Sequence, residues 1–312
     1  MVAGGGQGFW TMTGEGGRVR AWRKALGLLM LLLLVLVLGV FAFSRIDPTG
    51  FGDARRSVRV ALGLPKIWVK GVNTDTRGLV AVACPADAIV IVTGGQSNAA
   101  NALSDPLQPD SASHSYMVQD GRCYPLRDPV LGATGQGGSL WSGLGPALAR
   151  QSGRPVVFIN GAVGGSQLGD WLDERSGYAA RLLTQVAAAR QAGMTADHVI
   201  WIQGETDAAA RTDPAVYVGQ LKALMVVFDA SGTLPADVPW LVFRSTRCKD
   251  RPNNGAALDA AVTAFAEQSP RVTAGPLASA LGNEARWDTC HFNGHGRDLL
   301  VAETLPLLGE GR

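Results

Sequence analysis

Short runs of apolar β-branched and aromatic residues alternate with longer segments of helical character, and this alternation constrains the fold more than any other feature. A strand that is apolar on both faces must be covered on both faces, as in a parallel sheet between two layers of helices. The strand-like runs are residues 88–94, 155–160, 198–203, 239–245 and, more weakly, 271–275, and the helical segments are residues 140–151, 178–192, 215–230, 255–268 and 296–308. The sequence therefore predicts a three-layer α/β/α sandwich with a mostly parallel five-stranded sheet.

One segment near the N-terminus, Ala25–Phe43, consists of 19 residues without a polar side chain. This length is close to the roughly 20 residues that a helix needs to cross the hydrocarbon core of a bilayer. Signal-peptide cores are usually shorter, about 7–15 residues, and end in a small-x-small cleavage site. Because Phe43 stands where such a site requires a small residue, we predict a retained transmembrane signal-anchor, with a cleaved signal peptide as the alternative.

Basic residues predict the orientation of this anchor. Arg18, Arg20, Arg23 and Lys24 precede the span, and only Arg45 follows it closely. Since the cytoplasmic flank of an anchor carries the excess of Lys and Arg, we expect the rest of the chain on the extracytoplasmic side, periplasmic or extracellular. The predicted parts are a Gly-rich and basic cytoplasmic segment (1–24), the anchor (25–43), a juxtamembrane linker (44–87) and one globular domain (88–312).

Charge and cysteine content narrow the class of protein further. A net charge of +2 over 312 residues, without a recurring basic block in the body of the chain, argues against nucleic acid as a partner. The cysteines, Cys84, Cys123, Cys248 and Cys290, include no C-x-x-C pair, so a metal site is not expected. In an exported domain their even number predicts up to two disulfides in any of three connectivities, and buried free thiols are the alternative.

Polar residues and glycines follow the predicted strands, at the edge where open parallel sheets bind their ligands. These blocks are GGQSN (94–98), GAVGGSQLGDW (161–171), QGETD (203–207) and, near the C-terminus, WDTCHFNGHG (287–296). Each block alone is compatible with an ordinary turn or helix cap. Together they place a serine, a histidine, a carboxylate, glycine amides and an amide side chain at one edge of the sheet.

These groups are the parts of a serine acyl hydrolase. Ser97 is the candidate nucleophile, because a serine hydroxyl attacks an ester once a neighbouring base accepts its proton. His291 is the candidate base, and Asp288 can orient its imidazole and stabilise the charged form. The oxyanion formed on attack requires N–H donors, for which the candidates are the backbone amides of Ser97 and Gly165 and the side chain of Gln203.

The four blocks resemble those of the SGNH hydrolase superfamily and, within it, of the carbohydrate esterases related to sialate O-acetylesterase. GGQSNAAN resembles the nucleophile block of that group, in which Gly-Gln-Ser-Asn replaces the usual Gly-Asp-Ser, and AVGGSQLGDW, WIQGETD and DTCHFNGHG are similar to its other blocks. The resemblance covers roughly residues 88–305 and implies a flavodoxin-like SGNH fold. Ala99 departs from the methionine that the group often has at this position.

The resemblance also implies a function and a role for each matched residue. Ser97 would be the nucleophile, Gly165 an oxyanion donor, and His291 the base with Asp288 as its partner; Gln203 stands where most of the superfamily has asparagine. The implied function is a serine esterase that removes O-acetyl groups from a carbohydrate through an acetyl-enzyme, without a metal or an organic cofactor. The resemblance does not identify the sugar.

Further residues are expected to support this site. Gln96, Asn98 and Glu205 are interpreted as side chains that hold the site loops in place. Cys248 follows the fourth strand and Cys290 adjoins the candidate base, so a disulfide between them would brace the loop that carries the histidine.

Flanking residues have expected roles of their own. Trp171 and Trp287 adjoin two of the blocks, where an indole can stack on a sugar ring or pack in the core. Asp170 is expected to cap the second loop. His295 is an alternative base, with a less suitable spacing from the candidate aspartate.

Three other functions are alternatives at this stage. An α/β-hydrolase would require a G-x-S-x-G elbow, which residues 95–99 do not provide. A membrane-anchored O-acetyltransferase acting on a cell-surface polysaccharide would form the same acyl-enzyme and pass the acetyl group to a sugar hydroxyl. A catalytically inactive carbohydrate-binding module would be expected to have lost Ser97 or His291.

Overall fold

The computed structural model of the chain describes residues 15–46, 71–249 and 253–309. The first part of the Gly-rich segment and most of the predicted linker, residues 47–70, lie outside the described residues. The chain divides into two compact units, Met1–Pro65 and Lys66–Arg312.

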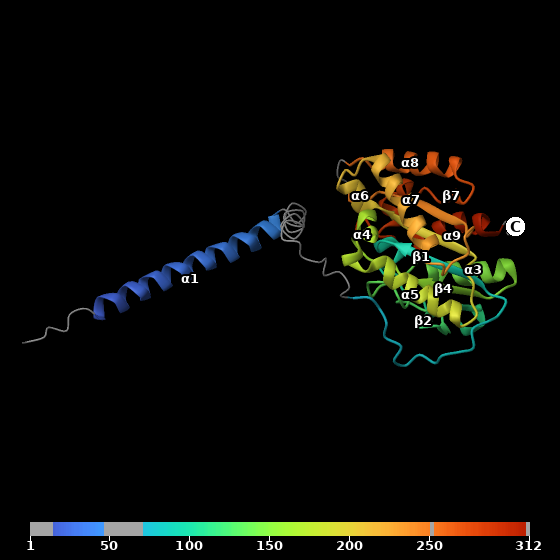
Figure 1. Cartoon of the computed structure of the whole chain (residues 1–312), viewed down its shortest axis with the longest axis horizontal. Helices are drawn as coiled ribbons and strands as arrows, with labels where there is room; N and C mark the ends of the chain where they lie inside the picture. The colour runs from blue at the N-terminus through green and yellow to red at the C-terminus, as the bar shows by residue number, and fades with distance from the viewer. Residues whose placement is uncertain (1–14, 47–70, 250–252, 310–312) are drawn as a thin grey trace, which may run out of the picture. The chain divides into compact units, whose positions relative to one another are not determined.

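The described part of the first unit is a single helix, α1 (Glu15–Ile46; Figure 1). Within it, Trp22–Ala42 forms a 21-residue stretch with a mean hydropathy of 3.0, long and apolar enough to cross a membrane. Leu31, Leu36 and the other large apolar side chains described in this stretch are exposed to the surroundings. Their exposure is what a segment that lies in lipid requires, and a signal sequence shares the same properties.

The second unit is built on one seven-stranded sheet with the strand order β3-β2-β4-β1-β5-β6-β7. All neighbouring pairs are parallel except β2 and β3. The strands are β1 (Ile89–Gly95), β2 (Ser115–Gln119), β3 (Arg122–Pro125), β4 (Val156–Asn160), β5 (His198–Gly204), β6 (Trp240–Ser245) and β7 (Val272–Ala274). The five strands expected from the sequence are β1, β4, β5, β6 and β7.

The predicted strand count of five is therefore too low, because the β2–β3 hairpin has a weak pattern. Its two strands are joined by Asp120 and Gly121, which both have positive φ angles of 51° and 73°. An Asp-Gly pair in this conformation is the preferred two-residue hairpin turn. The hairpin contains few β-branched residues, but Met117 and Val118 are fully buried and join the core.

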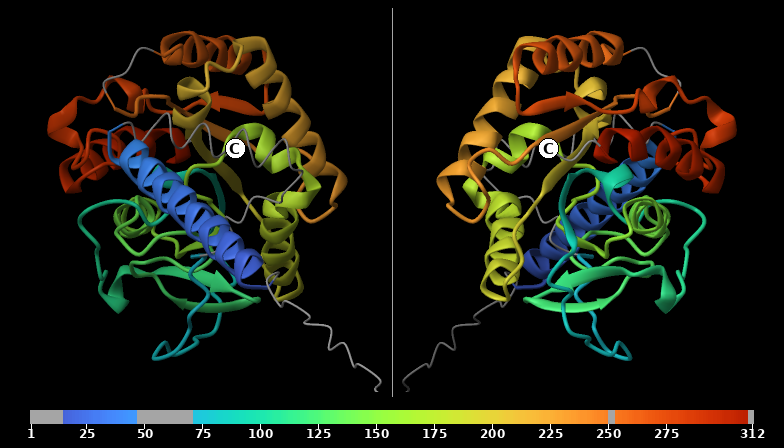
Figure 2. Two further views of the ribbon diagram at one scale, coloured as in Figure 1. Left: turned by 90° about the vertical axis from the view of Figure 1, so that its left-hand side faces the viewer. Right: turned by 90° about the vertical axis from the view of Figure 1, so that its right-hand side faces the viewer.

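Helices cover both faces of the sheet, as the sequence predicts, and the alternation along β1 shows why. Ile89 and Ile91 point to one face, where α3 and α9 pack, and Val90 and Val92 point to the other, where α5, α7 and α8 pack. The left-hand view of Figure 2 shows α3 and α9 on one side of the sheet and α5 and α7 on the other. Burial of apolar side chains on both faces stabilises the three layers.

The helices that form these layers are α3 (Trp141–Ser152), α5 (Tyr178–Gln191), α7 (Pro214–Ala230), α8 (Gly255–Gln268) and α9 (Gly294–Gly309). Two short helices, α4 (Leu168–Leu172) and α6 (Glu205–Ala209), follow β4 and β5. One-turn 3₁₀ helices occur at Ser97–Ala99 (η1), Ser111–Ser113 (η2), Glu174–Ser176 (η3), Ala278–Ala280 (η4) and Asn283–Ala285 (η5).

Residues 71–87, which the sequence places in the linker, pack against the sheet unit. Val72 forms an isolated bridge with Thr134, and the Asn73 side chain donates to the carbonyl of Pro129 at 2.7 Å. A disulfide joins Cys84 to Cys123 on β3. These contacts fix the segment to the edge of the sheet that carries the hairpin.

Candidate active site

Ser97 lies directly beyond β1, at the start of η1. The chain turns sharply before it, and Gly95, with φ +116°, makes this turn: a Cβ there would lie 2.0 Å from the carbonyl oxygen of Ile202 on β5. The backbone N–H of Gln96 donates to the same carbonyl at 2.9 Å. The turn lifts Ser97 out of the buried strand, so its side chain lies half-buried at the rim of the sheet.

The segment from Trp287 to His291 forms a closed turn that presents the histidine. Asp288 Oδ1 accepts hydrogen bonds from the backbone N–H groups of Cys290, at 3.0 Å, and His291, at 2.6 Å. The N–H of Trp287 donates to the carbonyl of His291 at 3.0 Å, and Thr289 takes the left-handed conformation with φ +65°. The D-x-x-H spacing thus lets one carboxylate fix both the backbone and the ring of the histidine.

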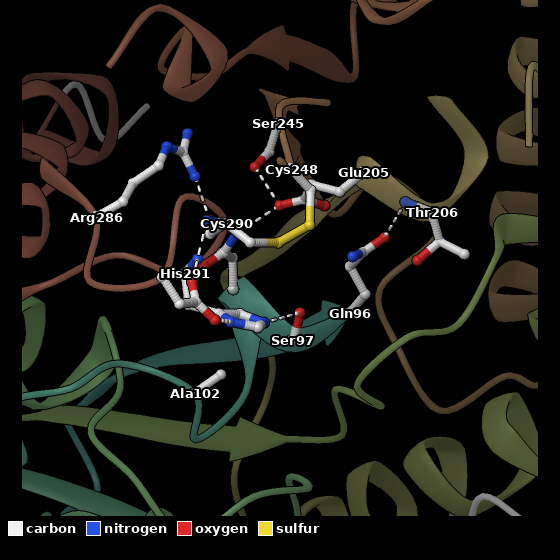
Figure 3. The surroundings of a disulfide bond; sticks show 12 residues. Gln96, Ser97, Ala102, Glu205, Thr206, Ser245, Cys248, Arg286, Cys290 and His291 are labelled. Atoms are coloured by element: carbon white, nitrogen blue, oxygen red, sulfur yellow. Dashed lines mark hydrogen bonds and ion pairs between the residues drawn. A yellow bond between two sulfur atoms is a disulfide. The ribbon is translucent and has the colours of Figure 1, made fainter. Parts of the chain in front are cut away.

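Ser97, His291 and Asp288 form a continuous hydrogen-bonded relay. His291 Nε2 lies 2.9 Å from Ser97 Oγ, and His291 Nδ1 lies 2.7 Å from Asp288 Oδ2 (Figure 3 shows the serine and the histidine). Burial would raise the pKa of Asp288, but the hydrogen bonds from the backbone and ring of His291 outweigh it, and the net pKa is lowered. Asp288 is therefore an ionised acceptor for the Nδ1 proton at neutral pH.

A second loop lies beside Ser97. A Cβ on Gly164 would lie 3.7 Å from the Ser97 Cβ atom, and the N–H of Gly164 donates to the Thr134 hydroxyl at 2.7 Å. Gly165 follows with φ +70° and open space where a side chain would stand. Within the described part of the chain, the backbone N–H groups of Ser97 and Gly165 have no protein acceptor, which leaves both able to donate to a bound oxyanion.

Gln203 lies at the end of β5 and is buried. Its Nε2 donates to the carbonyl of Ser166 at 2.9 Å and to the Ser166 hydroxyl at 3.3 Å, and its Oε1 accepts from Trp201 Nε1 at 3.1 Å. The amide nitrogen is thus directed at Ser166, in the loop that carries Gly165. In this structure Gln203 holds that loop, and the donors proposed for the oxyanion are the backbone N–H groups of Ser97 and Gly165.

Asn98 and Glu205 connect the nucleophile loop to its neighbours. Asn98 Nδ2 donates to Glu205 Oε1 at 2.6 Å and to the carbonyl of Cys290 at 3.3 Å. Glu205 Oε1 also accepts from the Ser245 hydroxyl at 2.7 Å, whereas its Oε2 is buried without a partner. Burial raises the pKa of Glu205. Gln96 Oε1 accepts from the N–H of Thr206 at 3.1 Å, which ties the same loops together (Figure 3).

Arg286 is a site-supporting residue that the sequence analysis did not single out. Its guanidinium is buried and donates to the backbone carbonyls of Cys290 and, at 2.8 Å, Ala278. Burial lowers its pKa to about 10, so it stays charged, and the nearby charge of Glu205 favours that form. Arg286 and Asn98 therefore hold the same carbonyl, one residue before the histidine.

A disulfide joins Cys248, in the loop after β6, to Cys290 (Figure 3). This pair is the bridge that the sequence predicts from the position of the two cysteines. The backbone N–H of Lys249 also donates to the carbonyl of Thr289 at 3.1 Å. The loop that carries His291 is thus fixed to the end of β6 by one covalent bond and one hydrogen bond.

The flanking residues divide clearly by exposure. Trp171 is 2% exposed and packs in the core, whereas Trp287 is 56% exposed beside His291. Asp170 caps α4 in a reciprocal capping box with Gln167, as expected. His295 is exposed on α9, and the imidazole that shares a hydrogen bond with Ser97 is that of His291.

No group of three or more His, Cys, Asp and Glu side chains in the described ranges is arranged to hold a metal ion. A hollow of about 460 Å³ lies between residues 72–79 and the segment 127–136, with Arg77, Arg127 and Gln136 in its lining. No residue of the Ser97 relay lines this hollow, so it is separate from the candidate active site.

A family model described as "Carbohydrate esterase, sialic acid-specific acetylesterase" matches residues 88–303. No curated protein matched the sequence.

Several solved structures resemble the fold. A protein from Arabidopsis thaliana is 14% identical with a TM-score of 0.59, over 71% of this chain and 97% of that one. A carbohydrate acetylesterase from Xanthomonas citri is 18% identical with a TM-score of 0.46, over 69% of this chain and 54% of that one. A carbohydrate esterase from Talaromyces cellulolyticus is 14% identical with a TM-score of 0.45, over 71% and 96%. At these identities the similarity to the Arabidopsis protein shows a shared fold.

Proposed function

Because the chain belongs to the family of carbohydrate esterases described as sialic acid-specific acetylesterases, we propose that it is a serine esterase that removes O-acetyl groups from a carbohydrate. The observation that carries this proposal is the relay from Ser97 through His291 to Asp288 at the carboxyl edge of the sheet. A hydroxyl, an imidazole and a carboxylate in this order form the arrangement that activates a serine for attack on an ester.

In the first step, His291 Nε2 accepts the proton of the Ser97 hydroxyl as Oγ attacks the acetyl carbonyl carbon. The 2.9 Å separation of these two atoms allows direct transfer. Asp288 holds the Nδ1 proton and stabilises the imidazolium that forms. The former carbonyl oxygen becomes an oxyanion, for which the backbone N–H groups of Ser97 and Gly165 are the proposed donors.

In the second step, the bond between the acetyl carbon and the sugar oxygen breaks. His291 returns its proton to that oxygen, the sugar leaves as an alcohol, and the acetyl group remains on Ser97. A water molecule then gives a proton to His291 and attacks the acetyl carbon, which releases acetate and restores the serine hydroxyl. The His291 and Asp288 side chains are 24% and 30% exposed, so a water molecule can reach the base.

The proposal also includes the location of the protein in the cell. We propose that α1 anchors the chain in a membrane and that the esterase domain, residues 88–312, lies on the extracytoplasmic side. Two disulfides among the described cysteines support an oxidising compartment. The proposed substrate is an O-acetylated carbohydrate outside the cytoplasm, and the mechanism requires no cofactor.

The experiment that tests this function compares three forms of the full-length chain in detergent: the wild type, Ser97→Ala and Ser231→Ala. Ser231 caps the C-terminus of α7, the helix that returns the chain from the carboxyl end of β5 to the amino end of the parallel strand β6, and serves as the matched control. Hydrolysis of p-nitrophenyl acetate and acetate release from an acetylated glucoside are measured. We expect both activities in the wild type and the control and their loss in Ser97→Ala. Equal rates in all three forms would refute the proposal.

A further inference from the structure

Trp287 is unusual among the tryptophans that the structure describes in the sheet unit. Trp141, Trp171, Trp201 and Trp240 are at most 2% exposed, whereas Trp287 is 56% exposed. A large aromatic side chain gains free energy when it is removed from water, so leaving much of an indole in solvent gives up that gain. Trp287 stands four residues before His291, on the same closed turn.

The indole is nevertheless fixed in place. Its Nε1 donates to the carbonyl of Ala102 at 3.0 Å, and its backbone N–H donates to the carbonyl of His291 at 3.0 Å. Its ring is inclined by 25° to the His291 imidazole, with the ring centroids 6.1 Å apart. The polar edge of the indole is thus already bonded to the protein, and what it offers to a ligand is its apolar surface.

An apolar, flat surface that hydrogen bonds hold beside the candidate base suits a particular ligand. A pyranose ring presents several C–H groups on one face, and these pack on the face of an aromatic ring, while its hydroxyl and ester groups project from the edge. The indole lies beside the imidazole, with the ring centroids 6.1 Å apart, so a sugar ring that stacks on Trp287 lies next to His291 and can direct an ester on its edge toward Ser97 Oγ, 2.9 Å from His291 Nε2.

We propose that Trp287 is the platform for the pyranose ring that carries the acetyl group, and that it makes the site prefer acetylated sugars to simple acetyl esters. This inference rests on the proposed function, because it assigns the substrate contact of the same site. Trp287 would act by binding the sugar and would take no part in the proton transfers. Simple esters, which have no ring to stack, would be hydrolysed independently of it.

The test compares two substrates by the same readout, the release of acetate. Methyl glucopyranoside tetraacetate carries a pyranose ring, and ethyl acetate carries none; p-nitrophenyl esters are avoided because their aromatic ring could itself stack on the indole. The full-length chain in detergent is compared with Trp287→Ala, with Trp287→Phe, which keeps a flat ring but loses the N–H, and with Leu277→Ala, a control for an exposed apolar side chain outside the site.

We expect Trp287→Ala to raise KM for the glucoside about tenfold, the size of a lost aromatic contact, and to change kcat/KM for ethyl acetate less than about threefold. The KM of Trp287→Phe for the glucoside should lie between those of the wild type and Trp287→Ala, and Leu277→Ala should have the kinetic constants of the wild type. Equal losses on both substrates, with a shifted pH profile of kcat, would show that Trp287 positions His291 and would overturn the proposal. Unchanged kinetics would overturn it as well.

Failure of the proposed function gives a different result. A wild type that releases acetate from neither substrate would refute the esterase activity itself. A wild type that hydrolyses ethyl acetate but shows no preference for the glucoside would leave the esterase activity intact and contradict only the role of Trp287.

Discussion

Asp207 carries a pH dependence of stability that asparagine at this position should remove. The side chain is 1% exposed, next to the loop that carries Gly165. Its two carboxylate oxygens accept from the N–H of Leu168, the first residue of α4, at 3.3 and 3.2 Å. Burial is the main cause that raises the pKa of Asp207 to about 7, the Leu168 hydrogen bond opposes it, and the nearby charge of Glu205 adds to it.

The direction of the effect follows from where the proton is held. Between about pH 4 and pH 7 the folded protein keeps a proton on Asp207 that the unfolded chain has released. The free energy of unfolding therefore falls as the pH rises through this window, and this contribution is constant above it. A shift from 3.8 to about 7 corresponds to about 4 kcal/mol over the whole window, of which about 2–3 kcal/mol is lost between pH 5 and pH 8.

Asp207→Asn should abolish this loss, because the amide stays neutral and its oxygen can still accept from Leu168. Urea unfolding is followed by tryptophan fluorescence of the full-length chain in detergent, at pH 5 and at pH 8. We expect the free energy of unfolding of the variant, relative to that of the wild type, to be about 2–3 kcal/mol higher at pH 8 than at pH 5. Asp237→Asn removes one charge from the exposed surface and serves as the control. A difference between Asp207→Asn and the wild type that does not change with pH would refute the reasoning.

Three further substitutions test the site. Gly165→Ala places a Cβ in open space at φ +70°, so it should lower the free energy of unfolding by about 1–2 kcal/mol and lower kcat/KM for p-nitrophenyl acetate about tenfold. Its control is Gly153→Ala, at φ +69° and also in open space, which should lower the free energy of unfolding equally and leave the activity unchanged. Asp288→Asn should lower kcat by about three to four orders of magnitude without raising KM, because the imidazole loses its charged partner; an unchanged kcat contradicts the relay. Replacing both Cys248 and Cys290 by serine opens a loop of 42 residues and should cost about 4 kcal/mol in urea unfolding, together with part of the activity; unchanged stability would contradict the bracing role.

The sequence predicts the helices and the central strands well because burial on both faces leaves a clear pattern. The helical segments at residues 140–151, 178–192 and 255–268 differ from α3, α5 and α8 by at most a residue at each end. The β2–β3 hairpin was missed because its strands are short and partly polar. The Asp120-Gly121 turn was the signal that could have revealed it.

The residues of the candidate site likewise include some that the sequence predicts and some that it does not reveal. Ser97, Asp288 and His291 are predicted together because each lies in a recognisable block, and the structure brings them into one relay. Arg286 was missed because its guanidinium acts on the backbone carbonyls of Cys290 and Ala278, and a contact to a carbonyl leaves no pattern among the side chains of the sequence. Gln203 has a suitable side chain for an oxyanion donor, but tertiary contacts direct its amide to Ser166.

The central claim is that Ser97 forms an acetyl-enzyme, and the most direct measurement looks for that intermediate. The full-length chain is mixed with p-nitrophenyl acetate, quenched with acid within the first turnovers, digested and analysed by mass spectrometry. We expect one acetyl group on the peptide that contains Ser97, and none on that peptide in Ser97→Ala. A wild type that hydrolyses the ester but carries the acetyl group on another residue, or carries none under any quench time, would contradict it.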